Sequence, residues 1–185
     1  MILVLASRSP QRRAILSQLG VEFEVVVPAG VEELTSGPPH EVVAENAYRK
    51  AAAVAADRPE ATVLGVDTEV AIGARVYGKP ASVQDARAML VELAGRRHTV
   101  LSGVCVFSEG RARTAIASTA VDFRPLDDAL LDWYLSSEEW RERAGGYAVQ
   151  GRGAALVARI EGDYFNVVGL PVPTLLELLP SLLAD

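Results

Sequence analysis

The chain has 185 residues, 50% of them hydrophobic, and a formal net charge of −6 at pH 7. This length and composition predict a single domain over residues 1–185, or at most two tightly joined lobes, that buries about 70% of its unfolded surface. The negative charge argues against general nucleic-acid binding, which needs a broad basic face. No apolar stretch approaches the roughly 18 to 20 residues of a membrane span. Residues 1–4 lack the basic start of a signal peptide, so we expect a cytoplasmic protein that binds neither nucleic acid nor membrane.

The first predicted elements are a buried strand and a helix joined by a tight turn. The apolar run at residues 2–5 predicts the strand. Ser9 and Pro10 predict the start of the helix, and Gly20 its end. Three arginines surround the helix N-terminus: Arg8, Arg12 and Arg13. Free N–H groups and the helix dipole favour an anion there, so the turn predicts a phosphate site. The alternative is an ordinary strand–helix junction with solvated arginines.

Strands and helices alternate along the rest of the chain. The predicted strands are residues 22–27, 62–66, 97–107, 113–123 and 155–160, with a hairpin at 70–76. The predicted helices are residues 41–56, 82–93, a helix that begins at Asp127, and 171–183. Because hairpins interrupt the alternation, we expect a mixed sheet in an α/β fold.

Few residue types remain to carry chemistry. The chain has two histidines and one cysteine, Cys105, which lies in an apolar strand, so a zinc site or a Ser-His-Asp triad is poorly supported. A metal would be held by carboxylates, which suits Mg²⁺ or Mn²⁺. Asp67 is the best candidate, because it follows a buried strand where α/β folds place ligand-contacting groups. The alternative is a turn residue. Candidate companions of Asp67 in holding a metal are Glu32, Glu33 and Glu69. The alternative for each is a solvated surface charge.

Lysine is scarce in this chain. Of its 18 basic residues, only Lys50 and Lys79 are lysines. A lysine ammonium is a compact charge that can reach a single phosphate oxygen where a planar guanidinium does not fit. The two lysines are therefore candidate phosphate ligands, and chance loss of the others is the alternative.

Seven motifs in order make the chain similar to a known family. They are Ser7-x-Ser9-Pro10-x-Arg12-Arg13, Glu45-Asn46-Ala47-x-x-Lys50-Ala51, Asp67-Thr68, Gly78-Lys79-Pro80, Gly95-Arg96-x-His98-Thr99-Val100, Gly145-Gly146-Tyr147-Ala148-Val149-Gln150-Gly151 and Gly162-Asp163-x-x-Asn166-Val167-x-Gly169-Leu170-Pro171. The chain resembles the Maf family of nucleoside triphosphate pyrophosphatases over almost its whole length.

The resemblance implies a fold and a site. The fold is a mixed α/β structure with two lobes around a cleft, similar to inosine triphosphate pyrophosphatases. Five residues would contact phosphates: Ser7, Arg12, Arg13, Lys50 and Lys79. Asp67 would act as the general base, and Glu33 with Asp67 would hold a divalent cation. Three residues would read the base: Arg12, Thr68 and Gln150. A homodimer is expected by the same analogy.

The implied reaction is hydrolysis of a nucleoside triphosphate to the monophosphate and pyrophosphate. Thr68 and the loop around Gln150 indicate the branch that acts on dTTP and UTP. Two alternatives stay open: the branch that acts on CTP or methylated GTP, and a nucleotide-binding regulator of septum formation with little turnover. The chain departs from the family at Gln11, where many members have an arginine, and at Glu69, where most have an apolar residue.

Overall fold

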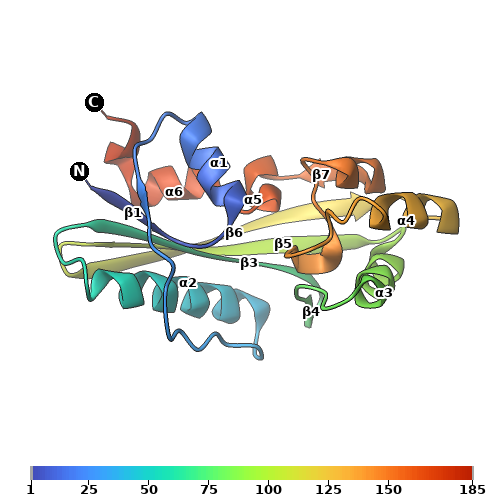
Figure 1. Cartoon of the computed structure of the whole chain (residues 1–185), viewed down its shortest axis with the longest axis horizontal. Coiled ribbons are helices and arrows are strands. Elements are labelled where there is room, and N and C mark those ends of the chain that lie inside the picture. The colour runs from blue at the N-terminus through green and yellow to red at the C-terminus, as the bar shows by residue number, and fades with distance from the viewer. Residues whose placement is uncertain (1, 185) are drawn as a thin grey trace. The chain divides into compact units, whose positions relative to one another are not determined.

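The computed structural model in Figure 1 describes residues 2–184. The chain divides into two compact units. The first unit holds the residues up to Thr68, Ser102–Ala117 and the residues from Gly169 onward, and the second holds Glu69–Leu101 and Ser118–Val168. Strands β3 (Thr62–Ile72), β5 (Arg97–Ser108) and β6 (Arg111–Phe123) contribute residues to both units. The single domain over residues 1–185 stays a prediction.

The strands form a mixed sheet, as the sequence predicts. Their order is β2-β1-β3-β5-β6-β7, and β4 pairs with β3. The bounds of the short strands are Leu3–Ala6 for β1, Glu24–Val25 for β2, Arg75–Tyr77 for β4 and Val157–Glu161 for β7. Strand β1 is parallel to β2 and β3, whereas β4 and β7 are antiparallel to their partners. The α/β fold class is confirmed.

In the first unit, helices cover both faces of the sheet. Figure 1 shows α2 (Pro39–Ala55) on one face, and α1 (Pro10–Gln18) with α6 (Val172–Leu178) on the other. Small and β-branched side chains of α2, β1 and β3 make a core that also holds Cys105. The Cys105 thiol is fully buried, and this burial raises its pKa, as expected of a structural thiol.

Helix α2 lies unusually close to the sheet. A side chain at Gly65 on β3 would overlap the backbone carbonyl oxygen of Ala47, and one at Gly103 on β5 would overlap that of Val43. Neither glycine has a positive φ. Glycine is therefore needed at both positions for space rather than for backbone conformation. The absence of two side chains sets the distance between the helix and the strands.

The second unit has its own core. Its helices are α3 (Val83–Leu93), α4 (Asp128–Leu135), α5 (Tyr164–Val168) and the 3₁₀ turns at Ala144–Gly146 and Arg152–Leu156. Ser82 caps α3 and Asp127 caps α4, each through its side-chain oxygen. The core includes leucines of α3 and α4 together with the aromatic side chains of Phe123, Trp140 and Tyr147.

A histidine lies inside this second core. His98 is 2% exposed, its Nε2 lies 2.8 Å from the Tyr147 hydroxyl, and its ring packs edge-on against Phe123 and Tyr147. Burial lowers the pKa of His98 to about 4, although the charge of Asp122 opposes the shift. The imidazole is therefore neutral in the folded protein at neutral pH.

Each predicted strand differs from the structure by at least one residue at one end, and three of the differences have a structural cause. The predicted strand at 62–66 and the start of the hairpin at 70–76 form a single strand, so the prediction that the strand ends before Asp67 is wrong. The strand continues because Val70–Ile72 pair with β4. The strand predicted at 22–27 is reduced to β2, since only Glu24 and Val25 pair with β1. The strand predicted at 155–160 starts later, because residues up to Leu156 form a 3₁₀ turn.

The predicted closing helix at 171–183 is also interrupted. It splits into α6 and a 3₁₀ turn at Pro180–Leu183. Leu179 leaves the helical conformation, with φ −134° and ψ 72°, because the following Pro180 excludes it. Within residues 2–184, no helix combines the length and the apolar character that crossing a bilayer requires.

The close approach of α2 predicts the effect of a single methyl group. We expect Gly103→Ala to lower the free energy of unfolding by about 1 to 3 kcal/mol, because the methyl group overlaps the helix backbone. Gly78→Ala is the matched control, since a side chain there meets no atom within 4 Å. Urea unfolding followed by circular dichroism measures both. Equal stability of the two variants would contradict the packing described for Gly103.

The buried His98 predicts a dependence of stability on pH. In the unfolded chain, histidine takes up a proton below about pH 6.5. Folded His98 stays neutral until its own pKa of about 4. Its contribution to stability is therefore complete above pH 6.5 and is lost as the pH falls to 4. Relative to His98→Phe, we expect the wild-type free energy of unfolding to decrease by about 3 kcal/mol from pH 7 to pH 4. Parallel pH curves for the two proteins would contradict this.

Candidate functional site

The turn between β1 and α1 holds the first part of the site. Ser9 caps α1 by accepting a hydrogen bond from the Arg12 N–H at 3.4 Å, and Pro10 takes the first helical position. The Ser7 side chain is buried, and its Oγ accepts from the Ser9 N–H at 3.1 Å. Gln11 joins this network, because its Oε1 accepts from the Ser9 hydroxyl. The strand, cap and helix predicted here are confirmed.

The Arg12 side chain bonds to residues from three other parts of the chain. Its Nη1 donates to Ser7 Oγ at 3.1 Å, its Nη2 to Thr68 Oγ1 at 3.2 Å and its Nε to the Gly169 carbonyl at 2.9 Å. The Thr68 hydroxyl also lies 2.8 Å from that of the buried Ser102. Three acceptors bonded to three different nitrogens hold the guanidinium in one orientation.

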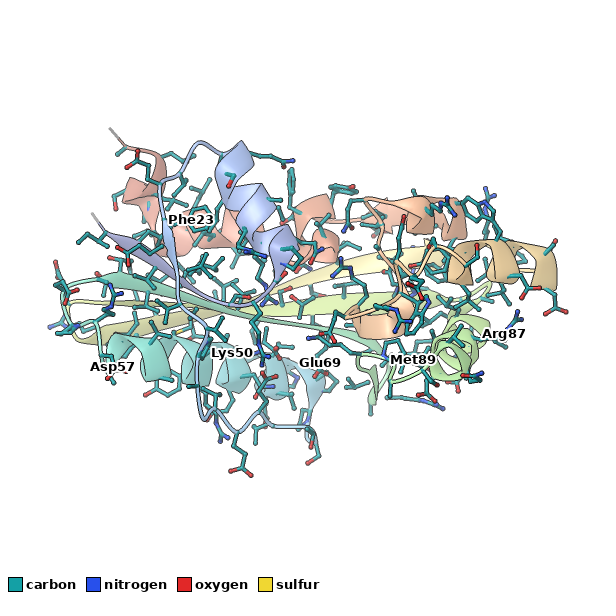
Figure 2. All side chains as sticks on the ribbon, in the orientation of Figure 1. Phe23, Lys50, Asp57, Glu69, Arg87 and Met89 are labelled. Carbon is teal, nitrogen blue, oxygen red and sulfur yellow. The ribbon has the colours of Figure 1, made fainter. Side chains whose placement is uncertain are left out.

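The second part of the site is a carboxylate held by a lysine. Asp67 is buried, and its Oδ1 accepts from Lys50 Nζ at 2.6 Å. The same ammonium lies 3.1 Å from Glu33 Oε1. Figure 2 labels Lys50, whose side chain leaves α2 toward the strands. The Lys50 side chain is 13% exposed and that of Asp67 is 11% exposed, whereas Glu33 is half exposed. One ammonium therefore bridges a buried carboxylate and a solvent-facing one.

Asn46 completes the carboxylate cluster, which consists of Glu33, Asn46, Lys50 and Asp67. Its Nδ2 donates to Asp67 Oδ2 at 3.1 Å and to the Leu34 carbonyl at 3.0 Å, and its Oδ1 accepts from the Leu34 N–H at 2.7 Å. Asn46 precedes Lys50 by one helical turn, so both side chains project from the same face of α2. The two residues hold different oxygens of the same carboxylate.

The two parts of the site lie on opposite faces of the sheet and meet at one end of a strand. Adjacent side chains on a strand point to opposite faces, so Asp67 points toward α2 and Thr68 toward α1. Strand β1 pairs with β3 only as far as Ala6 opposite Gly65, two residues before Asp67. The site thus lies at the carboxyl end of β1, where α/β sheets bind ligands.

The charges of the two parts act on each other. Arg12 is half-buried. This burial lowers the pKa of Arg12, while the negative charges of Asp67 and Glu33 act in the opposite direction and favour its charged form. Carboxylates on one face therefore help to keep a half-buried arginine charged on the other.

The carboxylate cluster suits a divalent cation whose remaining ligands would come from water and a bound substrate. Among residues 2–184, no group of three histidine, cysteine, aspartate or glutamate side chains is placed to hold a metal ion. Glu33 Oε1 and Asp67 Oδ1 both contact the Lys50 ammonium, which lies between the two carboxylates. Mg²⁺ is commonly held by one or two carboxylates, with water and substrate phosphates as its other ligands. The donor set fits such an ion.

Comparison with known proteins identifies the family. The family model described as "Maf-like protein" matches residues 2–182. This chain belongs to the Maf family. Three relatives of this Maf chain carry the name dTTP/UTP pyrophosphatase. The relative from Pyrococcus furiosus is 42% identical over 96% of the chain and 93% of its own length. The relative from Gloeobacter violaceus is 46% identical over 96% of the chain and 94% of its own length. The relative from Moorella thermoacetica is 48% identical over 96% of the chain and 93% of its own length.

Two solved structures give partial matches to the Maf chain. A nucleoside-triphosphatase, also titled dITP/XTP pyrophosphatase, from Mycobacterium abscessus is 18% identical with a TM-score of 0.46, covering 68% of the chain and 76% of its own. The Ham1 protein of Staphylococcus aureus is 15% identical with a TM-score of 0.48, and the match covers 66% of this chain and 72% of the Ham1 chain. Both TM-scores lie below 0.5.

Most of the predicted site residues of this Maf chain come together in the first unit. These are Ser7, Arg12, Glu33, Lys50, Asp67 and Thr68. Arg13 is exposed on α1. Lys79, Gln150 and Glu69 belong to the second unit, where Lys79 Nζ lies 3.0 Å from Glu142 Oε2 and Gln150 is exposed. The roles of all these residues in binding and catalysis stay predictions.

Sequence reasoning did not select three groups that hold the site together: Asn46, Ser102 and the carbonyl of Gly169. Asn46 and Gly169 lie in motifs that were recognised, and a polar residue such as Asn46 amid the apolar residues of an amphipathic helix was a usable signal. Ser102 gave no signal, because a serine in a β-rich run is common. A backbone carbonyl such as that of Gly169 has no signature in a sequence.

The three hydrogen bonds of Arg12 predict that lysine is a poor substitute. We expect Arg12→Lys to lower the free energy of unfolding by about 2 kcal/mol, because a single ammonium cannot reach all three acceptors. Arg13→Lys, at the neighbouring exposed position, is the control and should change stability by less than about 0.5 kcal/mol. Urea unfolding measures both. The description of Arg12 is wrong if the two variants are equally stable.

Proposed function

We propose that this chain hydrolyses dTTP and UTP between the α and β phosphates, releasing the nucleoside monophosphate and pyrophosphate. Relatives that share 42% to 48% of its residues over nearly their full length carry the name dTTP/UTP pyrophosphatase. The observation that carries the proposal is that Asp67 and the cationic turn of Arg12 lie at the same end of β1, where Arg12 bonds to Thr68 next to Asp67. A base next to groups that neutralise phosphate charge is what cleavage of a phosphoanhydride requires.

In this mechanism, Asp67 acts on the attacking water. The Asp67 carboxylate accepts a proton from the water while the water oxygen forms a bond to the α phosphorus. The bond from the α phosphorus to the bridging oxygen breaks, and its electron pair leaves with pyrophosphate. The hydrogen bonds from Asn46 and Lys50 hold the carboxylate in place without occupying all of its lone pairs.

Cationic groups stabilise the charge that develops on pyrophosphate. We assign this role to Ser7 and Arg12 in the turn and to Lys50 on α2, with Arg13 and Lys79 as further phosphate ligands. Burial strengthens the attraction of the Arg12 guanidinium to an anion, because fewer water molecules screen it.

A divalent cation belongs to the proposal. Glu33 and Asp67 would hold Mg²⁺ or Mn²⁺, and when bound the ion would neutralise charge on the phosphates. Lys50 bridges the two carboxylates and holds them close together.

Base selection is assigned to Arg12, Thr68 and Gln150. An amide such as that of Gln150 can pair with either uracil or cytosine by flipping, so it does not select by itself. The Thr68 hydroxyl is oriented by Arg12 and Ser102 and supplies a fixed polar group. A homodimer in the cytoplasm, with a nucleoside triphosphate as substrate, completes the proposal.

A panel of nucleoside triphosphates tests the reaction and the choice of base together. With Mg²⁺ or Mn²⁺ present, we expect pyrophosphate as the initial product and dTTP and UTP ahead of CTP by about tenfold in kcat/KM, since an unpaired polar group costs about 1 to 3 kcal/mol. Orthophosphate as the sole initial product would contradict the reaction. Equal efficiency on CTP and UTP would contradict only the choice of base, and binding without turnover would favour a regulatory role.

Removing the proposed general base, Asp67, is the second half of this test. We expect Asp67→Asn to lower kcat about 100-fold or more, because the amide keeps the shape but cannot take the proton. Asp57→Asn is the control, since Asp57 is an exposed aspartate just beyond α2. An unchanged rate for Asp67→Asn would remove Asp67 from the mechanism.

A further inference from the structure

Asn46 lies in the interior at the centre of the carboxylate cluster. It is 1% exposed, and both polar atoms of its carboxamide are engaged. A buried amide of this kind is costly unless its hydrogen bonds are satisfied. Its bonds go to the Asp67 carboxylate and to the backbone next to Glu33, so the amide calls for an explanation beyond packing.

The backbone of Leu34 fixes which way the Asn46 amide faces. The Leu34 N–H can only donate, so the atom that meets it at 2.7 Å must be Oδ1. Nδ2 then faces the Leu34 carbonyl and Asp67 Oδ2, to both of which it donates. The orientation of the amide is therefore set by the main chain and is imposed on the carboxylate.

The same two bonds hold the segment that carries Glu33. Leu34 directly follows Glu33 in a segment without helix or strand between β2 and α2. Both main-chain polar groups of Leu34 bond to Asn46, which places the Glu33 carboxylate within 3.1 Å of Lys50 Nζ. A half-exposed glutamate on a long loop would otherwise sample many positions. Asn46 thus contacts one carboxylate directly and positions the other through the backbone.

We propose that Asn46 is a positioning residue that holds Asp67 and the Glu33 segment so that their carboxylates, which both contact Lys50, are placed to share one divalent cation. The inference rests on the proposed function, because it assigns Asn46 to the geometry of that same site. Without Asn46, Asp67 loses one of its hydrogen bonds and Leu34 loses two. The Glu33 segment then keeps the bond from Arg49 to the Glu32 carbonyl and the contact between Glu33 and Lys50, which leave it less firmly placed. The protein then binds a divalent cation more weakly and turns over more slowly.

The test compares two buried asparagines. Asn46→Ala removes the proposed anchor. Asn166→Ala is the matched control, because Asn166 is also fully buried and donates to the Val100 carbonyl and Thr119 Oγ1, within the other unit. For each variant, three quantities are measured: the melting temperature, the binding of Mn²⁺ alone by electron paramagnetic resonance, and kcat and KM for dTTP.

We expect both variants to melt at a lower temperature, since each loses a buried amide. We expect only Asn46→Ala to bind Mn²⁺ about tenfold or more weakly and to lose about tenfold or more in kcat, with KM changed less, since misplaced catalytic groups act on the chemical step. Asn166→Ala should keep the wild-type Mn²⁺ affinity and kcat. A purely structural role for Asn46 predicts that the two variants behave alike, and that outcome would overturn the inference.

Two further arrangements keep the test decisive. If Asn46→Ala does not fold, then Asn46→Leu, which fills the volume without a polar group, is compared with Asn166→Leu by the same measurements. The wild-type protein is assayed first with dTTP. Failure of the wild type to release pyrophosphate would count against the proposed function, whereas normal turnover and Mn²⁺ binding by the Asn46 variant would count against the inference alone.

Discussion

The carboxylate half of the site depends on how closely α2 lies against the sheet. At Gly65 and Gly103 the backbone of the helix contacts the strands directly, with no side chain between them. Only at this separation can the short side chain of Asn46 reach Asp67, with Lys50 one turn further along the same face. Lengthening the helix–sheet distance by the size of a methyl group would exceed the tolerance of these hydrogen bonds. The packing of small residues is thus a requirement of the chemistry as well as of the core.

Opposite charges are organised on the two faces of the sheet. On the α2 side, Lys50 separates two carboxylates that would otherwise repel each other. On the α1 side, hydroxyl and carbonyl oxygens hold Arg12 and engage three of its five N–H groups. These contacts hold the charged groups in fixed positions, and groups fixed in this way need little reorganisation during a reaction. The carboxylates and Arg12 meet at the end of β1. There the negative charges of Asp67 and Glu33 act on the pKa of Arg12 and oppose the effect of its burial.

Local sequence signals predicted the elements well wherever a local interaction decides the structure. Ser9 with Pro10 and Gly20 marked α1, and Ser82 and Asp127 marked the starts of α3 and α4. The errors came from elements decided by partners. The strand through Asp67 continues because β4 pairs with its far end, and the strand expected at 22–27 keeps only the residues that pair with β1. Strand pairing is a property of two segments, so composition within one segment does not determine it.

The sequence by itself determined the fold class, the family, and the residue types of the site, because hydrophobic periodicity, helix caps and seven ordered motifs are local patterns. Only the tertiary structure decided which residues meet. Arg12 and Thr68 are 56 residues apart, and Asn46 and Asp67 are 21 apart. Their contacts follow from how helices are seated on the sheet, which glycines buried between them control. Hydrogen bonds act over about 3 Å, whereas a sequence pattern leaves helix positions uncertain by more than that distance.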